Sequence, residues 1–153
     1  SLQDYLWWSG LTSADARAGM AANGASLTSH KQNGRTLWFA THSTPAETFS
    51  GAILLPVYDE MVVAYTNRDA LLTRLGGQPT GPRGNGLMQN LLLLDGQVVG
   101  TWRRVERKTR IDLTLERFVP LSPGEEESFT AAAQRFGAFY NLAVTMTSPP
   151  KGL

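Results

Sequence analysis

The chain has 153 residues, of which 42% are hydrophobic and 18% are charged, so it can form one domain or two small domains with a buried core. Its net charge of +1 excludes an overall polybasic coat for nucleic acids. The absence of cysteine excludes disulfides and thiolate chemistry, and two histidines are too few for a histidine-rich metal site, so no cofactor is expected. Without a long apolar run or a signal peptide, the sequence predicts a soluble cytoplasmic protein with no membrane partner.

The first 45 residues predict two short helices followed by a β-hairpin. Apolar side chains at a spacing of three fit one side of a helix that ends before Gly10. Thr12 is the expected N-cap of a second helix that runs to about Ala22. Asn33-Gly34 then predicts a tight turn between two strands. This order is that of a winged helix-turn-helix without its first helix, so we expect a fragment of a longer protein or a helix borrowed from a partner.

Residues 46–153 predict a second domain that contains both strands and helices. A buried strand is expected at Ile53–Leu55, a hairpin around Asp95-Gly96, and an alternating, half-buried strand at Thr109–Arg117. Ser122-Pro123 begins a last helix whose aromatic and alanine stripe is expected to pack on the sheet, and the tail Thr145–Leu153 is expected to be frayed. The predicted fold class is therefore α+β: a partial winged helix-turn-helix, then an antiparallel β-rich domain with a C-terminal helix.

The densest basic cluster is Thr101–Arg110, with five cationic side chains and one acidic side chain. Cations along one surface bind phosphates through counterion release, and Trp102 beside them is a candidate for stacking on a base. Strand alternation, however, places Arg103 and Arg104 on opposite faces. Carboxylates on the next strand can also pair with these cations and leave a solvated sheet face. A phosphate-binding ribbon and a solvated face both remain open.

The second predicted helix offers little for reading bases in a groove. Arg17 is its basic residue, and Asp15 would repel phosphate. The hairpin that follows is better supplied, because Lys31 and Arg35 flank its turn. The alternative is that these elements serve only as a packing scaffold.

Asp59 and Glu60 are the paired carboxylates beside a predicted buried strand. General acid–base catalysis would need a partner within reach and a perturbed pKa. Neighbouring positions point to opposite sides of a strand, so a turn cap paired with Arg68 is favoured over a catalytic pair.

Three segments occur in this order: Tyr5–Arg17, Leu54–Glu60 with Tyr65–Asp69, and Asp95–Arg103. Together they resemble the C-terminal portion of a bacterial family of winged helix DNA-binding proteins, which includes glycosylases for interstrand crosslinks and alkylated bases. The resemblance implies tandem winged helices and a β-rich part around a basic concave surface. It also implies that the hairpin Asn90–Arg104 borders the DNA.

The Gln-x-Gln motif of the glycosylase members does not occur, because no two of the six glutamines are separated by one residue. The resemblance therefore implies the DNA-binding part of a DNA-repair protein, with phosphate contacts but no catalytic centre of its own. Its expected partners are double-stranded DNA and either a missing N-terminal half or a second copy. The alternative is a non-catalytic scaffold or protein-interaction module. The residues expected at the DNA are Arg17, Lys31, Arg35, Arg83, Trp102, Arg103, Arg104, Arg107 and Lys108.

Overall fold

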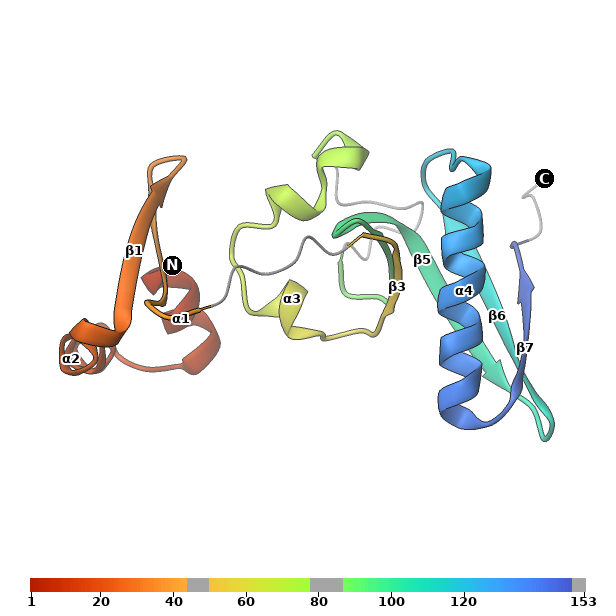
Figure 1. The fold of residues 1–153 in the computed structure, drawn as a ribbon, viewed down its shortest axis with the longest axis horizontal. Coiled ribbons are helices and arrows are strands. Elements are labelled where there is room, and N and C mark those ends of the chain that lie inside the picture. The colour runs from red at the N-terminus through yellow and green to blue at the C-terminus, as the bar shows by residue number, and fades with distance from the viewer. Residues whose placement is uncertain (44–49, 78–86, 150–153) are drawn as a thin grey trace. The chain divides into compact units, whose positions relative to one another are not determined.

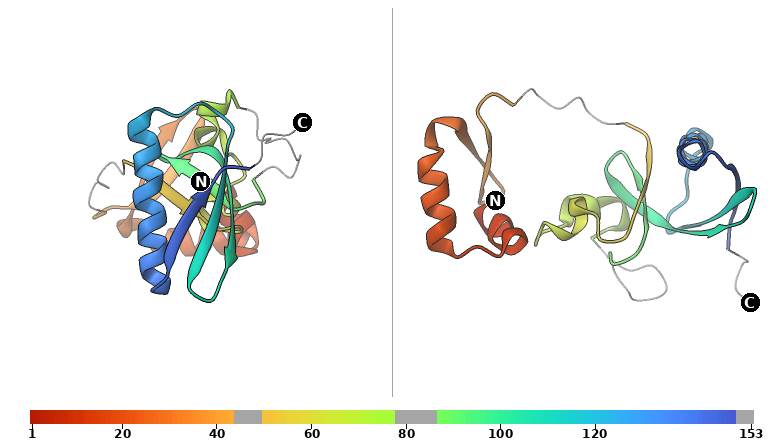
Figure 2. Two further views of the ribbon diagram at one scale, coloured as in Figure 1. Left: turned by 90° about the vertical axis from the view of Figure 1, so that its right-hand side faces the viewer. Right: turned by 90° about the horizontal axis from the view of Figure 1, so that it is seen from below.

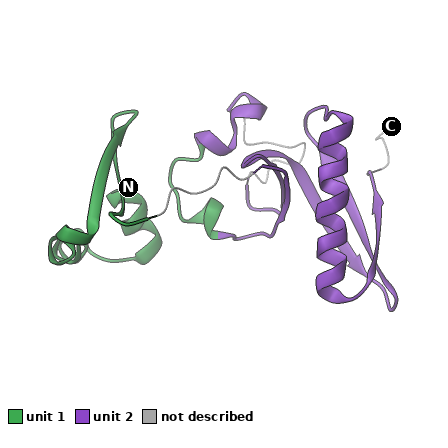
Figure 3. Ribbon diagram, viewed as in Figure 1, with its two compact units in different colours: residues 1–47, 60–68 green, residues 48–59, 69–153 purple. Residues whose placement is uncertain are grey.

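The computed structural model describes residues 1–43, 50–77 and 87–149. The chain divides into two compact units (Figure 3). Unit 1 holds residues 1–47 and 60–68, and unit 2 holds residues 48–59 and 69–153. The domain boundary predicted between residues 45 and 46 lies outside the described residues and stays a prediction.

Unit 1 is built from short helices and a two-stranded ribbon (Figure 1). Its elements are α1 (Leu2–Ser9), α2 (Ser13–Ala22), the 3-10 turn η1 (Gly24–Ser26), β1 (Leu27–Gln32), β2 (Arg35–Ala40) and α3 (Glu60–Val63). Gly10 ends α1 in the left-handed region at φ 69°, and the side chain of Thr12 caps α2 as predicted. The two helices and the hairpin are confirmed, and their assignment to a winged helix-turn-helix stays a prediction.

Asp4 holds α1 against the segment that follows α3. Its buried carboxylate accepts hydrogen bonds from the hydroxyl of Ser1 at 2.7 Å, and from the backbone N–H and hydroxyl of Thr66 at 3.0 and 2.8 Å. Burial raises the pKa of Asp4, but these hydrogen bonds lower it by more, so the net pKa lies well below the ordinary range. The Ser1-x-x-Asp4 spacing is a capping-box signal in the sequence. It indicates the contacts between Ser1 and Asp4, and it does not indicate those from Thr66.

The β1–β2 ribbon turns at Asn33 and Gly34, which both have positive φ angles of 49° and 75°. This pair of angles is typical of the type I′ turn that the sequence predicts. The register pairs Lys31 with Thr36, and Gln32 with Arg35. Because successive side chains alternate, Lys31 and Arg35 lie on opposite faces of the ribbon.

Unit 2 is a five-stranded sheet with one long helix. The strands lie in the order β3 (Ala52–Leu55), β4 (Leu91–Leu94), β5 (Gln97–Glu106), β6 (Arg110–Arg117) and β7 (Ala143–Thr147). All pairs are antiparallel except β6 with β7, which are parallel and joined through α4 (Pro123–Tyr140). Two 3-10 turns, η2 (Asp69–Leu71) and η3 (Thr73–Leu75), precede β4. The α+β fold with a mostly antiparallel sheet and a C-terminal helix agrees with the prediction.

The helix α4 lies along one face of this sheet (Figure 2). Phe129, Ala132 and Ala133 of α4 are buried against the sheet strands. On β6, Ile111, Leu113 and Leu115 have no exposed surface, as the alternation in the sequence predicts. The core of unit 2 therefore lies between α4 and the strands β4, β5 and β6.

The expectation of a frayed tail is wrong for residues 145–147, which belong to β7 (Ala143–Thr147). Val144 and Met146 pack against the core, so the short alternation of this segment is a strand pattern. Gly137 makes the approach possible, because a Cβ there would lie 2.5 Å from Cγ2 of Val144 and 2.6 Å from the carbonyl oxygen of Leu142.

Candidate nucleic-acid interface

The predicted DNA contacts fall mainly on two ribbons, one in each unit. In unit 1, Lys31 and Arg35 flank the tip of the β1–β2 ribbon, and both are exposed. They lie on opposite faces, so the ribbon presents a cation to each side of its tip. Within the part of the chain that the structure describes, neither residue forms an ion pair.

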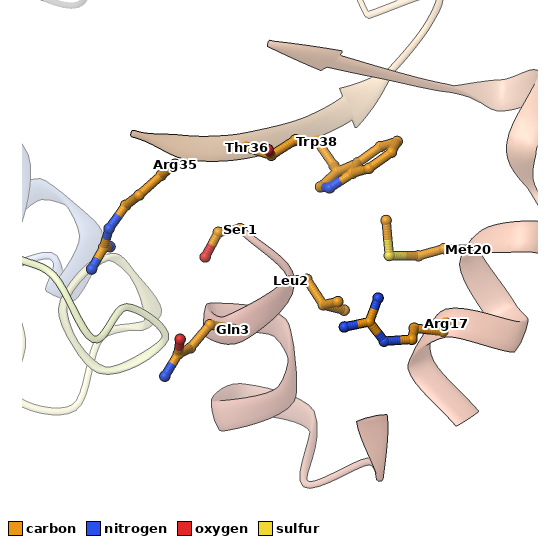
Figure 4. Close-up of a pocket in the computed structure, with 8 residues that line it drawn as sticks. All are labelled: Ser1, Leu2, Gln3, Arg17, Met20, Arg35, Thr36 and Trp38. Atoms are coloured by element: carbon orange, nitrogen blue, oxygen red, sulfur yellow. The ribbon is translucent and has the colours of Figure 1, made fainter. Parts of the chain in front are cut away.

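The structure brings Arg17 and Arg35 to one cavity of about 580 Å³ in unit 1. The cavity lies between α1, α2 and the ribbon, and Figure 4 shows Arg17 extending from α2 toward Leu2. Its lining contains no acidic side chain. The Nε of Arg17 donates to the hydroxyl of Ser13 at 3.3 Å, and Arg17 forms no ion pair with any residue that the structure describes.

In unit 2, the register of β5 with β6 places Arg103 opposite Thr114 and Arg104 opposite Leu113. The two arginines therefore lie on opposite faces of the sheet, as the strand alternation predicts. Arg103 lies on the face away from α4 and borders a cavity of about 280 Å³ that Glu116 also lines.

Arg104 is engaged on the face that α4 covers. Its guanidinium carbon lies 5.7 Å from the ring centre of Phe136 and 5.3 Å from that of Tyr140. It also donates to the hydroxyl of Tyr140 at 2.7 Å and pairs with Glu106 at 3.2 Å. These contacts compete with any phosphate contact. Sequence reasoning missed Tyr140 as a partner of Arg104 because no local pattern links positions 36 residues apart.

The tip of the β5–β6 ribbon is partly neutralised by one carboxylate. Asp112 pairs with Arg107 at 3.1 Å and with Arg110 at 2.7 Å. Hydrogen bonds from Arg110 and Arg107 hold the pKa of Asp112 below its ordinary value. Lys108 at the same tip is exposed and forms no ion pair within residues 1–43, 50–77 and 87–149. Arg107 and Arg110 therefore form the kind of ion pair that the solvated-face interpretation expects, and phosphate contact by Arg103 and Lys108 stays a prediction.

The structure does not support base stacking by Trp102. The residue is 5% exposed, and its ring packs edge-on with that of Phe136 at 5.4 Å between ring centres. Its indole N–H donates to the carbonyl of Leu55 at 3.0 Å. Stacking needs an open ring face, and Trp102 instead belongs to the buried core cluster of unit 2.

The remaining candidates lie elsewhere. Arg83 is outside the described residues. Glu60 is the first residue of α3 and Asp59 immediately precedes it, and Nε of Arg68 donates to the carbonyl of Val62 at 2.7 Å.

Among the described residues, no group of three or more histidine, aspartate or glutamate side chains is placed to hold a metal ion. No described helix is long and apolar enough to cross a membrane.

Comparisons with known proteins agree with the glycosylase part of the resemblance, whereas the winged helix assignment and the restriction to a C-terminal portion stay predictions. A family model described as DNA glycosylase AlkZ-like matches residues 1–139. A solved structure of Streptomyces sahachiroi DNA glycosylase AlkZ is similar, with a TM-score of 0.66 and 18% sequence identity. The match covers 96% of this chain and 41% of that chain, and at this identity it shows the fold. No curated protein matches the chain. The match over residues 1–139 shows that the chain belongs to the AlkZ-like family of DNA glycosylases.

Proposed function

We propose that this chain is a DNA-contacting portion of an AlkZ-like DNA glycosylase that acts in DNA repair in the cytoplasm. It binds the phosphates of double-stranded DNA, and the chemistry of base removal lies outside these 153 residues. Family membership supports the glycosylase assignment. The absence of a Gln-x-Gln motif supports the separation of DNA binding from catalysis.

The observation that carries the proposal is the distribution of cations on the two ribbons. On each ribbon, exposed basic side chains that form no ion pair with the described residues lie near the tip or along the strand that leads to it. These are Lys31, Arg35, Arg103 and Lys108. The β1–β2 ribbon has two strands, and such a ribbon fits a DNA groove that a phosphate backbone borders on each side, whereas the β5–β6 hairpin belongs to a five-stranded sheet. Cations on opposite faces of a ribbon that enters the groove tip-first reach both backbones. The placement of Lys31 and Arg35 on opposite faces of the ribbon is therefore suited to phosphate contact rather than to base readout.

The test is duplex binding by the 153-residue chain as a function of salt. Four phosphate contacts release about 0.9 counterions each, so the slope of log K against log salt is expected to be about −3 to −4. The double variant Lys31→Gln with Arg35→Gln should make the slope shallower by about 1.8. Arg74→Gln is the matched control, because Arg74 pairs with Glu125 at 2.8 Å and its loss should leave the slope unchanged. A slope near zero, or no binding at low salt, contradicts the proposal.

A second candidate function is that of a protein-interaction module. Trp7 and Trp8 on α1 are 63% and 58% exposed, which is unusual for such large apolar side chains. The indole N–H of Trp7 donates to the carbonyl of Val63 at 2.8 Å, so the ring is held in its exposed position. A folded chain that binds no duplex at any salt concentration would favour this candidate over DNA binding.

A further inference from the structure

The backbone of Tyr58 lies in the left-handed region, at φ 64°. The other positive φ angles among the described residues belong to glycine, asparagine and aspartate, which tolerate this region. A bulky aromatic residue rarely adopts it, because its Cβ crowds the backbone carbonyl oxygen that follows. Such strain persists where the surrounding structure enforces it, and it is concentrated at functional sites.

Contacts within unit 2 fix the segment that leads to Tyr58. The backbone N–H of Val57 donates to Oδ1 of Asn90 at 2.9 Å, and Nδ2 of Asn90 donates to the backbone carbonyl of Trp102 at 3.4 Å. The indole N–H of Trp102 donates to the carbonyl of Leu55 at 3.0 Å. The residues before Tyr58 are therefore tied to β5, and Tyr58 is held at the surface of unit 2.

The side chain of Tyr58 does not contribute to packing. Tyr58 is 71% exposed, and only Phe139 is more exposed among the large hydrophobic residues that the structure describes. The ring of Phe139 packs against that of Tyr140, at 5.1 Å between ring centres. Within residues 1–43, 50–77 and 87–149, the ring of Tyr58 contacts no other ring and its hydroxyl forms no hydrogen bond. Glycine would fit this backbone better without losing a ring contact, so folding does not explain a tyrosine here.

Val57 and Arg103 line one cavity of about 280 Å³ in unit 2. Arg103 is exposed and forms no ion pair with a described residue, and it is one of the cations assigned above to a DNA phosphate. Glu116 also lines the cavity, and its carboxylate disfavours a phosphate inside it, so a phosphate would stay at the rim beside Arg103. A DNA strand bound there would pass close to Tyr58, which directly follows Val57.

We propose that Tyr58 inserts its ring into a base step of duplex DNA, next to the phosphate that Arg103 binds. This inference rests on the proposed function and adds to it a residue that contacts the bases. An aromatic ring stacks on any base, because every base has a π-face, so the contact tolerates any sequence. Insertion costs the energy of unstacking one base step. A backbone already fixed with the ring exposed offsets part of this cost, because less conformational entropy is lost on binding.

The test is duplex binding by the 153-residue chain, with 2-aminopurine placed beside a mismatched base pair. Unstacking costs least at a mismatch, so the chain should bind the mismatched duplex about fivefold more tightly than the matched duplex. Binding should also change the fluorescence of 2-aminopurine, because the tyrosine ring replaces a stacked base as its neighbour.

Three substitutions at Tyr58 separate the ring from the backbone. Tyr58→Ala should remove the mismatch preference and the fluorescence change, whereas Tyr58→Phe should retain both. Tyr58→Gly should bind DNA as Tyr58→Ala does but unfold at a higher denaturant concentration, because glycine relieves the strain. A Tyr58→Gly variant that unfolds at a lower denaturant concentration than the unchanged chain would assign the ring to packing and overturn the proposal.

Phe139→Ala is the matched control, because it removes another highly exposed ring of unit 2, from α4. It should leave the mismatch preference unchanged. Arg103→Gln should make the slope of log K against log salt shallower by about 0.9, whereas Tyr58→Ala removes no charge and should leave the slope unchanged. A mismatch preference that persists in Tyr58→Ala, or that disappears in Phe139→Ala, overturns this inference.

The failures of the two proposals give different results. Salt-dependent binding of both duplexes without a mismatch preference refutes the insertion of Tyr58 and leaves phosphate binding intact. No binding of either duplex at low salt refutes phosphate binding and the insertion of Tyr58 together.

Discussion

Replacing Asp112 with asparagine is expected to strengthen DNA binding, although it removes two ion pairs. The carboxylate of Asp112 pairs with Arg107 at 3.1 Å and with Arg110 at 2.7 Å, and all three groups are exposed or half-exposed. Exposed ion pairs contribute little to folding, so the variant should remain folded. The change releases two guanidinium groups at the tip of the β5–β6 ribbon and raises its local charge by one.

The size of the effect follows from the two released cations. If each reaches a phosphate, the slope of log K against log salt becomes steeper by about 1.8. Between about 50 and 200 mM salt, that difference in slope corresponds to a change of about tenfold in relative affinity. The ratio of the duplex affinity of Asp112→Asn to that of the unchanged chain should therefore be largest at low salt. This ratio should fall about tenfold between about 50 and 200 mM salt.

Fluorescence anisotropy with a labelled duplex measures the effect across this salt range. Glu127→Gln is the matched control, since it changes the net charge equally on an exposed position of α4. It should leave the slope unchanged. An unchanged or shallower slope for Asp112→Asn would refute the assignment of the β5–β6 ribbon to phosphate contact. Because the guanidinium groups lower the pKa of Asp112, mild acidification should not reproduce the variant.

Three further predictions concern stability, each measured by denaturant unfolding. Asp4→Asn should cost about 1–3 kcal/mol through its lost charge-assisted hydrogen bonds. Because the folded-state pKa of Asp4 is lowered, that stabilisation should persist at neutral pH and decline as pH falls below the ordinary aspartate range of about 3.9. Gly100→Ala should cost about 1–3 kcal/mol, because its Cβ would clash with the backbone carbonyl of Glu116, whereas Gly124→Ala in open space should not destabilise. Phe129→Ala should cost about 3–5 kcal/mol, since this fully buried ring fills the core of unit 2.

The local elements of this fold were largely predictable, because their signals lie within a few residues. Asn33-Gly34 and Asp95-Gly96 both turn hairpins with positive φ angles. Ser122 caps α4 in the capping box that the sequence indicates. The strand β7 was missed although its short alternation is a strand pattern, and its pairing with β6 was not predictable because the two strands are joined through the whole length of α4.

The candidate site was predictable in composition and only partly in geometry. Strand alternation correctly separated Arg103 from Arg104. It did not indicate that Tyr140 and Glu106 engage Arg104, or that the ring of Trp102 is buried. Those outcomes depend on which side of the sheet a distant helix covers, and no local pattern in the sequence contains that information.

The assignment of residues 60–68 to unit 1 makes the two units interleaved along the chain (Figure 3). A peptide that ends at residue 47 lacks the Thr66 groups that bind Asp4 and the Val63 carbonyl that accepts from Trp7. Separate expression of the first 47 residues should therefore yield a protease-sensitive product. An evolutionary exchange of unit 1 between proteins would have to transfer residues 1–47 and 60–68 together. Recombination between residues 47 and 60 should therefore disrupt unit 1.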